Sequence, residues 1–95
     1  MRNALVQLAD LFGEVHEHDV PVEEIVLHPD DFQAFAERHS KDLCLTGAPW
    51  VSGEVVAYLW GAAVRLDDRI GIARVSLSGE LGGECWEHER PFYAV

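Results

Sequence analysis

Basic residues are scarce in this sequence. Seven Lys and Arg stand against seventeen Asp and Glu among 95 residues, which gives a formal net charge of −10. Proteins that bind nucleic acid or anionic membranes need clustered Lys and Arg to contact phosphate groups. The charge balance argues against both classes, so we expect no nucleic acid and no membrane among the partners of this chain.

Long apolar runs are also missing. No stretch approaches the ~18 consecutive apolar residues of a membrane-spanning helix. The first ten residues include Arg2 and Asp10 and lack the apolar core of a signal peptide. We therefore expect a cytoplasmic protein.

Cysteine occurs only twice, at Cys44 and Cys85. Neither belongs to a Cys-x-x-Cys pair, which excludes the zinc and redox motifs built on that spacing. In a reducing compartment an isolated cysteine usually packs as a small apolar side chain. We expect both cysteines to be buried, and a structural disulfide between them is the alternative.

The composition is otherwise that of a globular protein, with 48% hydrophobic and 25% charged residues. At ~150 residues per domain, we expect residues 1–95 to form a single domain. Residues 4–15 predict an amphipathic helix, because the larger apolar side chains fall within one arc of about 120°. Val6, Ala9 and Gly13 form a small-residue strip beside this arc. The strip is either half-exposed or packed against another backbone.

A short apolar run and a second helix follow. Residues 22–27 suit a buried strand, because apolar residues there are bounded by prolines. Pro29 suits the first turn of a helix, and His28 could cap that helix by accepting from a backbone N–H. Phe32 lies on the apolar face of this helix, which we expect to end between residues 38 and 41.

The C-terminal half predicts strands. Residues 54–66 are typical of a strand with apolar residues on both faces, in which Gly61 marks a bend or bulge and Trp60 fills the seam between sheet and helix. Residues 72–78 alternate between apolar and polar side chains, as in a strand with one buried face. The order of elements predicts a small α+β domain, with a mixed sheet and two amphipathic helices packed against it.

The loop and the tail carry further aromatic residues. We expect a long loop after the second helix, with a brief extended piece at residues 43–45. Trp50 in this loop is either an exposed anchor or a core residue, since tryptophan is favoured at the centres of interfaces. Residues 79–95 contain a final strand and end in Phe92 and Tyr93, which pack on the domain itself or on a neighbour.

Few residues have a spacing that indicates chemistry. The chain has no Gly-x-Ser-x-Gly nucleophile elbow and no glycine-rich phosphate loop followed by Lys-Ser or Lys-Thr. Imidazole and carboxylate groups near His16, His18 and His88 could hold a zinc-like ion. The first two histidines lie at a helix exit, where solvation of a turn is the simpler interpretation. We expect no enzyme, with no catalytic, cofactor-binding or metal-binding residues.

One ordered set of segments spans much of the chain. After the first helix come a strand-to-helix corner at residues 26–32, a Gly-x-Pro loop at 47–49, a Leu-Trp-Gly segment at 59–64 and a return strand at 69–75. Over residues 4–77 this order resembles the A-domain of the major capsid protein family of tailed phages, whose fold is shared with encapsulin shells. The residues on which we expect this fold to depend are Pro29, Phe32, Trp60 and Gly61.

The resemblance implies contacts between copies around a symmetry axis. The 95 residues leave no room for the long spine helix, the extended loop and the N-terminal arm of that family, so we expect a ring or other homo-oligomer rather than a shell lattice. Residues 79–95 match the family poorly. The candidate contact residues are Val6, Ala9, Gly13, Trp50, Phe92 and Tyr93.

Three functions are consistent with these features. The first is a non-enzymatic structural or assembly protein of phage or prophage type, which forms a homo-oligomer and is virion-associated if a phage encodes it. The second is an acidic adaptor that binds a protein with a basic surface, because the charge steers positive surfaces toward it. The third, less favoured, is a small metal-binding protein.

Overall fold

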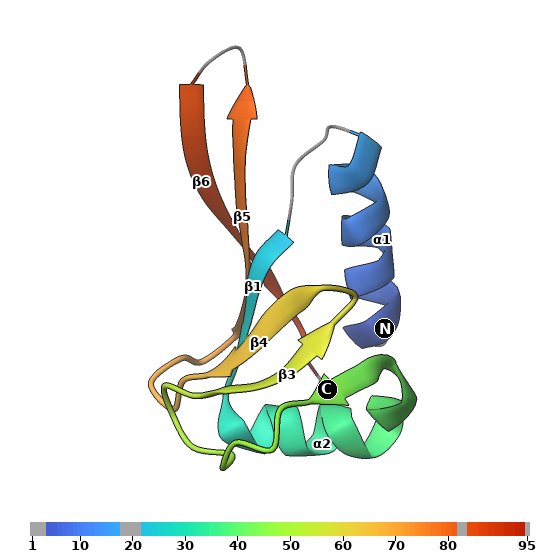
Figure 1. Cartoon of the computed structure of the whole chain (residues 1–95), viewed down its shortest axis with the longest axis vertical. Helices are drawn as coiled ribbons and strands as arrows, with labels where there is room; N and C mark the ends of the chain where they lie inside the picture. Colours follow the sequence, from blue (N-terminus) through green and yellow to red (C-terminus); the bar gives the residue numbers. More distant parts are fainter. Residues whose placement is uncertain (1–3, 18–21, 82–83, 95) are drawn as a thin grey trace.

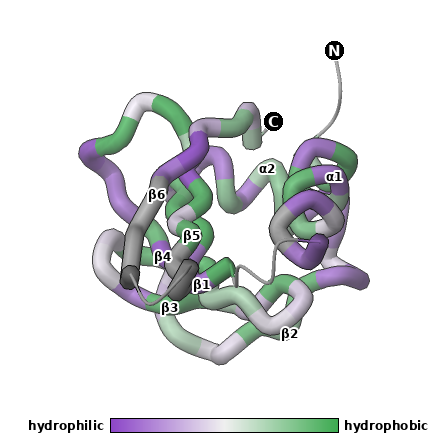
Figure 2. Tube along the Cα trace, turned by 90° about the horizontal axis from the view of Figure 1, so that it is seen from above, coloured by the Kyte–Doolittle hydropathy of each residue, from purple (hydrophilic) through white to green (hydrophobic). Residues whose placement is uncertain are grey.

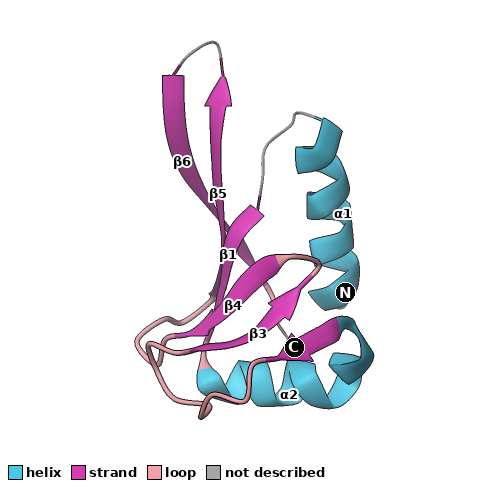
Figure 3. Cartoon of the chain, in the orientation of Figure 1, coloured by secondary structure: helices cyan, strands magenta, loops and turns pink. Residues whose placement is uncertain are grey.

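The computed structural model describes residues 4–17, 22–81 and 84–94, and at residues 15, 78–81 and 84–88 it describes the backbone alone. Within these ranges the chain forms two α-helices, one 3₁₀ turn and six strands (Figures 1 and 3). In chain order they are α1 (Ala4–Glu17), β1 (Val22–Leu27), α2 (Pro29–His39), η1 (Ser40–Asp42), β2 (Leu43–Leu45), β3 (Val55–Leu59), β4 (Ala62–Leu66), β5 (Ala73–Leu81) and β6 (Glu84–Phe92).

The six strands form one mixed sheet in the order β2-β3-β4-β1-β5-β6. Strands β1 and β4 are parallel, whereas every other neighbouring pair is antiparallel. Together with the two helices, this sheet confirms the expected α+β class. The brief extended piece expected at residues 43–45 is β2, an edge strand of the sheet.

One face of the sheet is buried and the other is open. Ile25 and Leu27 on β1 are buried, whereas the intervening Val26 is only half-buried. The alternation expected on β5 is confirmed, because Ala73, Val75 and Leu77 are all buried. Both helices lie on the same side of the central strands (Figure 2), as expected when one face of a largely antiparallel sheet is solvated.

Helix α1 packs its apolar arc on the sheet. Ala4 and Leu8 are each 1% exposed, and Leu5, Leu11 and Phe12 are partly buried against the same core. The helix extends to Glu17, two residues beyond its expected end. Its burial pattern is the one that the 3.6-residue period predicts.

The corner between β1 and α2 forms as the sequence predicts. His28 has extended backbone angles, and its Nδ1 accepts a hydrogen bond from the Asp30 N–H at 3.1 Å. Pro29 occupies the first turn, where a missing N–H has no helical partner to lose. Phe32 and Phe35 then enter the core with almost no exposed surface.

Residues 54–66 form a hairpin, not one bent strand. Strand β3 ends at Leu59, and its cross-strand partner Ala62 begins β4, so Trp60 and Gly61 are the two residues of the turn. Their φ angles are +49° and +88°, and positive φ at both positions is the signature of a type I′ turn. The expectation of a strand continuing through Trp60 is wrong, although Gly61 does have the special backbone that was expected.

The position of Trp60 is corrected accordingly. Its side chain is 45% exposed and does not belong to the buried core. The ring nevertheless reaches α1, where it packs edge to face on Phe12 with ring centroids 5.0 Å apart. The turn between β3 and β4 points toward this helix in Figure 1. Trp60 thus joins the hairpin to α1 at the margin of the core.

The β5–β6 hairpin extends past the rest of the sheet (Figure 1). Among the described residues, β1 pairs with β5 between the partners Val26↔Arg74 and Val22↔Leu77. From Ser78 onward, the residues of β5 pair with β6 and with no other described strand, ending at Leu81↔Glu84. In the part of the chain that the structure describes, this end of the hairpin is therefore a two-stranded ribbon.

In the ranges that the structure describes, neither helix has the length and apolar character needed to cross a membrane.

Candidate functional site

The small-residue strip of α1 lies on its solvent side. Val6 is 44% exposed, and Ala9 and Gly13 are exposed as well. A Cβ built on Gly13 would meet no atom within 4 Å. The strip is therefore accessible from outside the folded chain.

Trp50 was expected to be either an exposed anchor or a core residue, and it is partly packed and partly exposed. One edge of its ring packs against Phe32 with centroids 4.9 Å apart and an interplanar angle of 84°, while 44% of the residue remains exposed. The loop that carries it is tied to the sheet at both ends, by Thr46 N–H to the Val56 carbonyl at 3.0 Å and by Gly53 N–H to the Leu66 carbonyl at 2.8 Å. Trp50 is thus held in a fixed position at the surface.

The C-terminal residues separate into buried and exposed positions. Phe92 is 6% exposed and belongs to the core, so its assignment to an exposed contact surface is corrected. It pairs with Ala73 on β5, and the period of two turns its side chain toward the helices. Tyr93, the next residue, is 63% exposed.

Tyr93 also ties the tail to α1. Its N–H donates to Gln7 Oε1 at 3.2 Å, and Gln7 Nε2 donates to the Tyr93 carbonyl oxygen at 3.4 Å. Nearby, Arg90 Nη1 forms an ion pair with Glu14 Oε2 at 2.9 Å. These contacts join the first helix to the last strand.

The β2 edge, which we define by Cys44, Leu45 and Tyr58, carries exposed apolar side chains on both faces of the sheet. Cys44 and Tyr58 are cross-strand partners, both exposed on the open face, and Leu45 is 59% exposed. Residues 43–53 contain no charged side chain, in a chain with a net charge of −10. Sequence reasoning missed this surface, although the uncharged run is visible in the sequence.

Most of the exposed large hydrophobic side chains belong to the part of the sequence that contains β2, β3 and the loop between them. Among the residues that the structure describes, eight large hydrophobic side chains are exposed, and five of them lie in residues 43–64. Glu54 is the single charged residue in that segment. The five are Leu45, Trp50, Val51, Tyr58 and Trp60.

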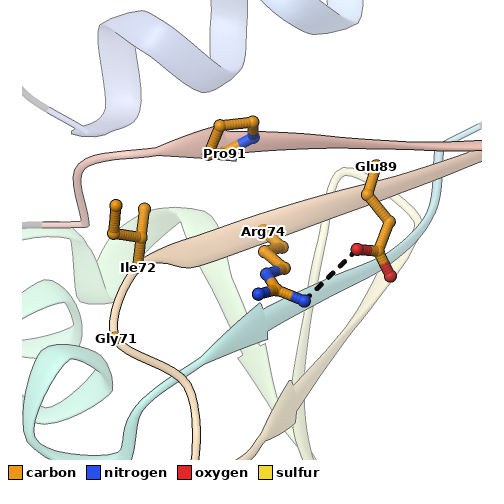
Figure 4. A pocket seen from close by; sticks show the side chains of 5 residues that line it. All are labelled: Gly71, Ile72, Arg74, Glu89 and Pro91. Atoms are coloured by element: carbon orange, nitrogen blue, oxygen red, sulfur yellow. Dashed lines mark hydrogen bonds and ion pairs between the residues drawn. The ribbon is translucent and has the colours of Figure 1, made fainter.

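A shallow hollow of about 410 Å³ lies at the other end of the sheet (Figure 4). Ile72 and Pro91 form its apolar part, and Arg74 and Glu89 form its polar part. The Arg74 Nη1 and Glu89 Oε2 atoms are 3.4 Å apart, so the two charges offset each other.

The histidines have separate roles. His28 caps α2, and His39 packs against Phe35 with ring centroids 4.9 Å apart. His16 is exposed in the last turn of α1. His18 and the side chain of His88 lie outside the described residues. Within the described part of the chain, no three His, Cys, Asp or Glu side chains are grouped as metal ligands would be.

Cys44 is a free, exposed thiol, which corrects the expectation that it is buried. The backbone of Cys85 lies in β6, at the opposite edge of the sheet. Five strand spacings of about 4.8 Å put these edges roughly 24 Å apart, whereas disulfide-bonded residues have Cα atoms within about 7 Å. The alternative of a disulfide within one chain is therefore excluded by the topology.

Asp67 lies directly after β4 and accepts hydrogen bonds in the connection between β4 and β5. Its Oδ1 accepts from the Arg69 N–H at 2.9 Å and from Arg69 Nε at 3.4 Å. The backbone hydrogen bond from Arg69 is the main cause that holds the pKa of Asp67 below its usual range, with the Arg69 side chain adding to it. The carboxylate therefore stabilises a turn, which is a structural role.

The comparisons with known proteins give no family for this chain. No protein-family model, no curated protein and no solved structure matches it.

Proposed function

We propose that this chain is a non-enzymatic structural or assembly protein that associates with copies of itself. The observation that carries the proposal is the concentration of exposed apolar side chains in residues 43–64, where Glu54 is the one charged residue. Exposed apolar side chains that recur in a segment with so little charge are typical of interaction surfaces. The phage-type setting rests on the resemblance to the capsid A-domain.

The exposed contact candidates support the same function. Val6, Trp50 and Tyr93 each present a large apolar surface to solvent. Trp50 is held against Phe32 on one side, so little side-chain entropy is lost when its other side meets a partner. Aromatic anchors of this kind often dominate the affinity of an interface.

Sedimentation equilibrium tests the proposal directly. At loading concentrations of about 10 μM to 1 mM, where weak interfaces associate, we expect a mass that rises above the 10.6 kDa of one chain. Native mass spectrometry then gives the number of copies. A mass of one chain at every concentration would contradict self-association.

A second candidate, the acidic adaptor, is favoured by the net charge of −10. Such a charge accelerates encounter with basic surfaces and is sensitive to salt. Binding of a basic model protein, such as lysozyme, with a measurable affinity at physiological ionic strength would support this candidate. Binding that disappears at that ionic strength would reflect only nonspecific attraction.

A further inference from the structure

We infer that the β2 edge is the surface through which two copies associate, with their β2 strands paired antiparallel across a twofold axis at Cys44. The inference rests on the proposed function and names the surface that it uses. The observations behind it are that one side of the edge strand β2 pairs with no described strand, that β2 has no charged residue, and that Leu45 on β2 and Tyr58 on β3 are exposed.

The backbone of β2 determines which groups face outward. Thr46 N–H donates to the Val56 carbonyl, which makes this a hydrogen-bonded pair of the ladder with β3. Hydrogen-bonded and non-hydrogen-bonded pairs alternate in an antiparallel ladder. Cys44 is therefore hydrogen-bonded to Tyr58, and the polar backbone groups of Leu43 and Leu45 turn away from β3.

A twofold axis at Cys44 uses these outward groups. It places Leu43 of each copy opposite Leu45 of the other. The Leu43 N–H already donates to the Ser40 carbonyl, so the Leu45 N–H groups are the donors and the Leu43 carbonyls are the acceptors. The pairing is isologous, because each copy gives the same donor and the same acceptor.

Charge identifies a second copy as the occupant. Two chains of net charge −10 repel each other, and this repulsion is smallest where neither surface has a charged residue. A basic partner would gain no electrostatic attraction from residues 43–53. The surface complementary to an uncharged apolar edge is another uncharged apolar edge, and every copy of this chain supplies one.

The opposite edge of the sheet shows how such pairing is usually prevented. Strand β6 carries Pro91, which has no N–H to donate, and four acidic or basic residues. Proline and charged side chains are the common devices that protect an edge strand from pairing. Strand β2 has neither, and its short length limits the number of new hydrogen bonds. We therefore expect a weak dimer rather than open-ended association.

Cys44 reports on this arrangement. In the twofold pair the two Cys44 residues face each other as a non-hydrogen-bonded pair, with Cα atoms about 4.5 Å apart. This distance lies within the range that a disulfide spans, about 4.4–6.8 Å. A mild oxidant such as diamide should therefore join the two thiols of a dimer, and the diamide takes up the two hydrogens that the thiols lose.

The experiment uses the full chain with Cys85→Ser, so that Cys44 is its one thiol. With diamide, we expect disulfide-linked dimers to form at least about ten times faster than in a control chain with Cys44→Ser, Cys85→Ser and Ile72→Cys. Ile72 is a matched control position because its exposure, 47%, resembles that of the β2 edge. The comparison separates specific pairing from random collision.

Sedimentation of two lysine variants completes the test. Leu45→Lys should weaken association at least tenfold, whereas Ile72→Lys, which changes the net charge equally, should leave it unchanged; circular dichroism confirms that both variants fold. If association persists in Leu45→Lys and Cys44 crosslinks no faster than the control, this surface is wrong and self-association stands through another one. If the chain is monomeric up to 1 mM, both the proposed surface and the proposed self-association are wrong. The β2 edge would then be available to pair with a strand of another protein.

Discussion

At the scale of single residues, His28 shows how one side chain defines the start of a helix. Its Nδ1 accepts the Asp30 N–H, which would otherwise lack a partner in the first turn of α2. We expect His28→Ala to lower the free energy of unfolding by about 1 kcal/mol, and His28→Asn to restore most of the loss because asparagine is a good N-cap. Urea denaturation measures both. Equal stability of the two variants would show that the cap contributes little.

Gly61 and Gly13 differ in backbone conformation, although both have free space where a Cβ would lie. A Cβ would meet no atom within 4 Å at either Gly61 or Gly13, yet Gly61 has a φ of +88° and Gly13 lies within a helix. We expect Gly61→Ala to destabilise the fold by about 1–2 kcal/mol, because L-residues avoid the left-handed region. Gly13→Ala should stabilise it by up to about 1 kcal/mol. Thermal denaturation of the two variants tests the opposite signs.

The ionised carboxylate of Asp67 makes stability depend on pH. Its pKa is lower in the folded chain than in the unfolded chain, so its contribution is present above about pH 4 and is lost as the pH falls through the folded-state value. We expect Asp67→Asn to be less stable than the parent at pH 7 and equal to it near pH 2. Asp68→Asn is the matched control, since it removes a neighbouring charge without touching the Arg69 contacts. A constant difference across the pH range would contradict the prediction.

The expectations for single residues are confirmed where local chemistry determines the position of the side chain. Pro29 and Phe32 occupy the first turn and the core as their sequence context indicates. The expectation for Trp60 is wrong, because this residue has a positive φ in a turn. Tryptophan rarely adopts positive φ, so the sequence does not indicate a turn at this position. Its contact with Phe12 offsets that cost, and this contact lies 48 positions away in the sequence, beyond the reach of any local pattern.

At the scale of elements, α1 is hydrogen-bonded to the tail that follows β6. Gln7 makes two hydrogen bonds to the backbone of Tyr93. We expect Gln7→Ala to cost about 1 kcal/mol and to speed amide hydrogen exchange in α1 more than in α2. Gln33→Ala, at an exposed glutamine on α2, is the control with the same change in helix propensity. Equal exchange in the two variants would show that the tail does not hold the helix.

The limits of sequence reasoning are clearest in the β2 edge and the hairpin. The alternation in β5 and the periodicity of α1 identify buried faces, because each pattern follows directly from element geometry. The open side of β2 follows instead from strand order, which depends on contacts distant in sequence. Cys44 therefore looked like an ordinary buried cysteine, although its place on an edge strand exposes it.

At the scale of the whole molecule, net charge opposes the proposed self-association. Two copies of charge −10 repel each other over the Debye length, which falls from about 30 Å at 0.01 M salt to about 3 Å at 1 M. Sodium chloride should therefore strengthen association of this chain with itself. Association with a basic partner should respond in the opposite direction, because screening weakens attraction. The sign of the salt dependence thus separates the two proposed functions.

A charge-reduced variant shows whether electrostatics causes this dependence. Glu17, Glu23 and Glu37 are exposed, and changing all three to Gln brings the net charge to −10 + 3 = −7. Long-range repulsion scales with the product of the two charges, so it falls to roughly half. We expect sedimentation equilibrium to give tighter association for the variant at low salt and a shallower change between 0.05 and 1 M sodium chloride. Equal salt dependence in the two chains would mean that salt acts on apolar contacts, since excluded salts also strengthen burial of apolar surface.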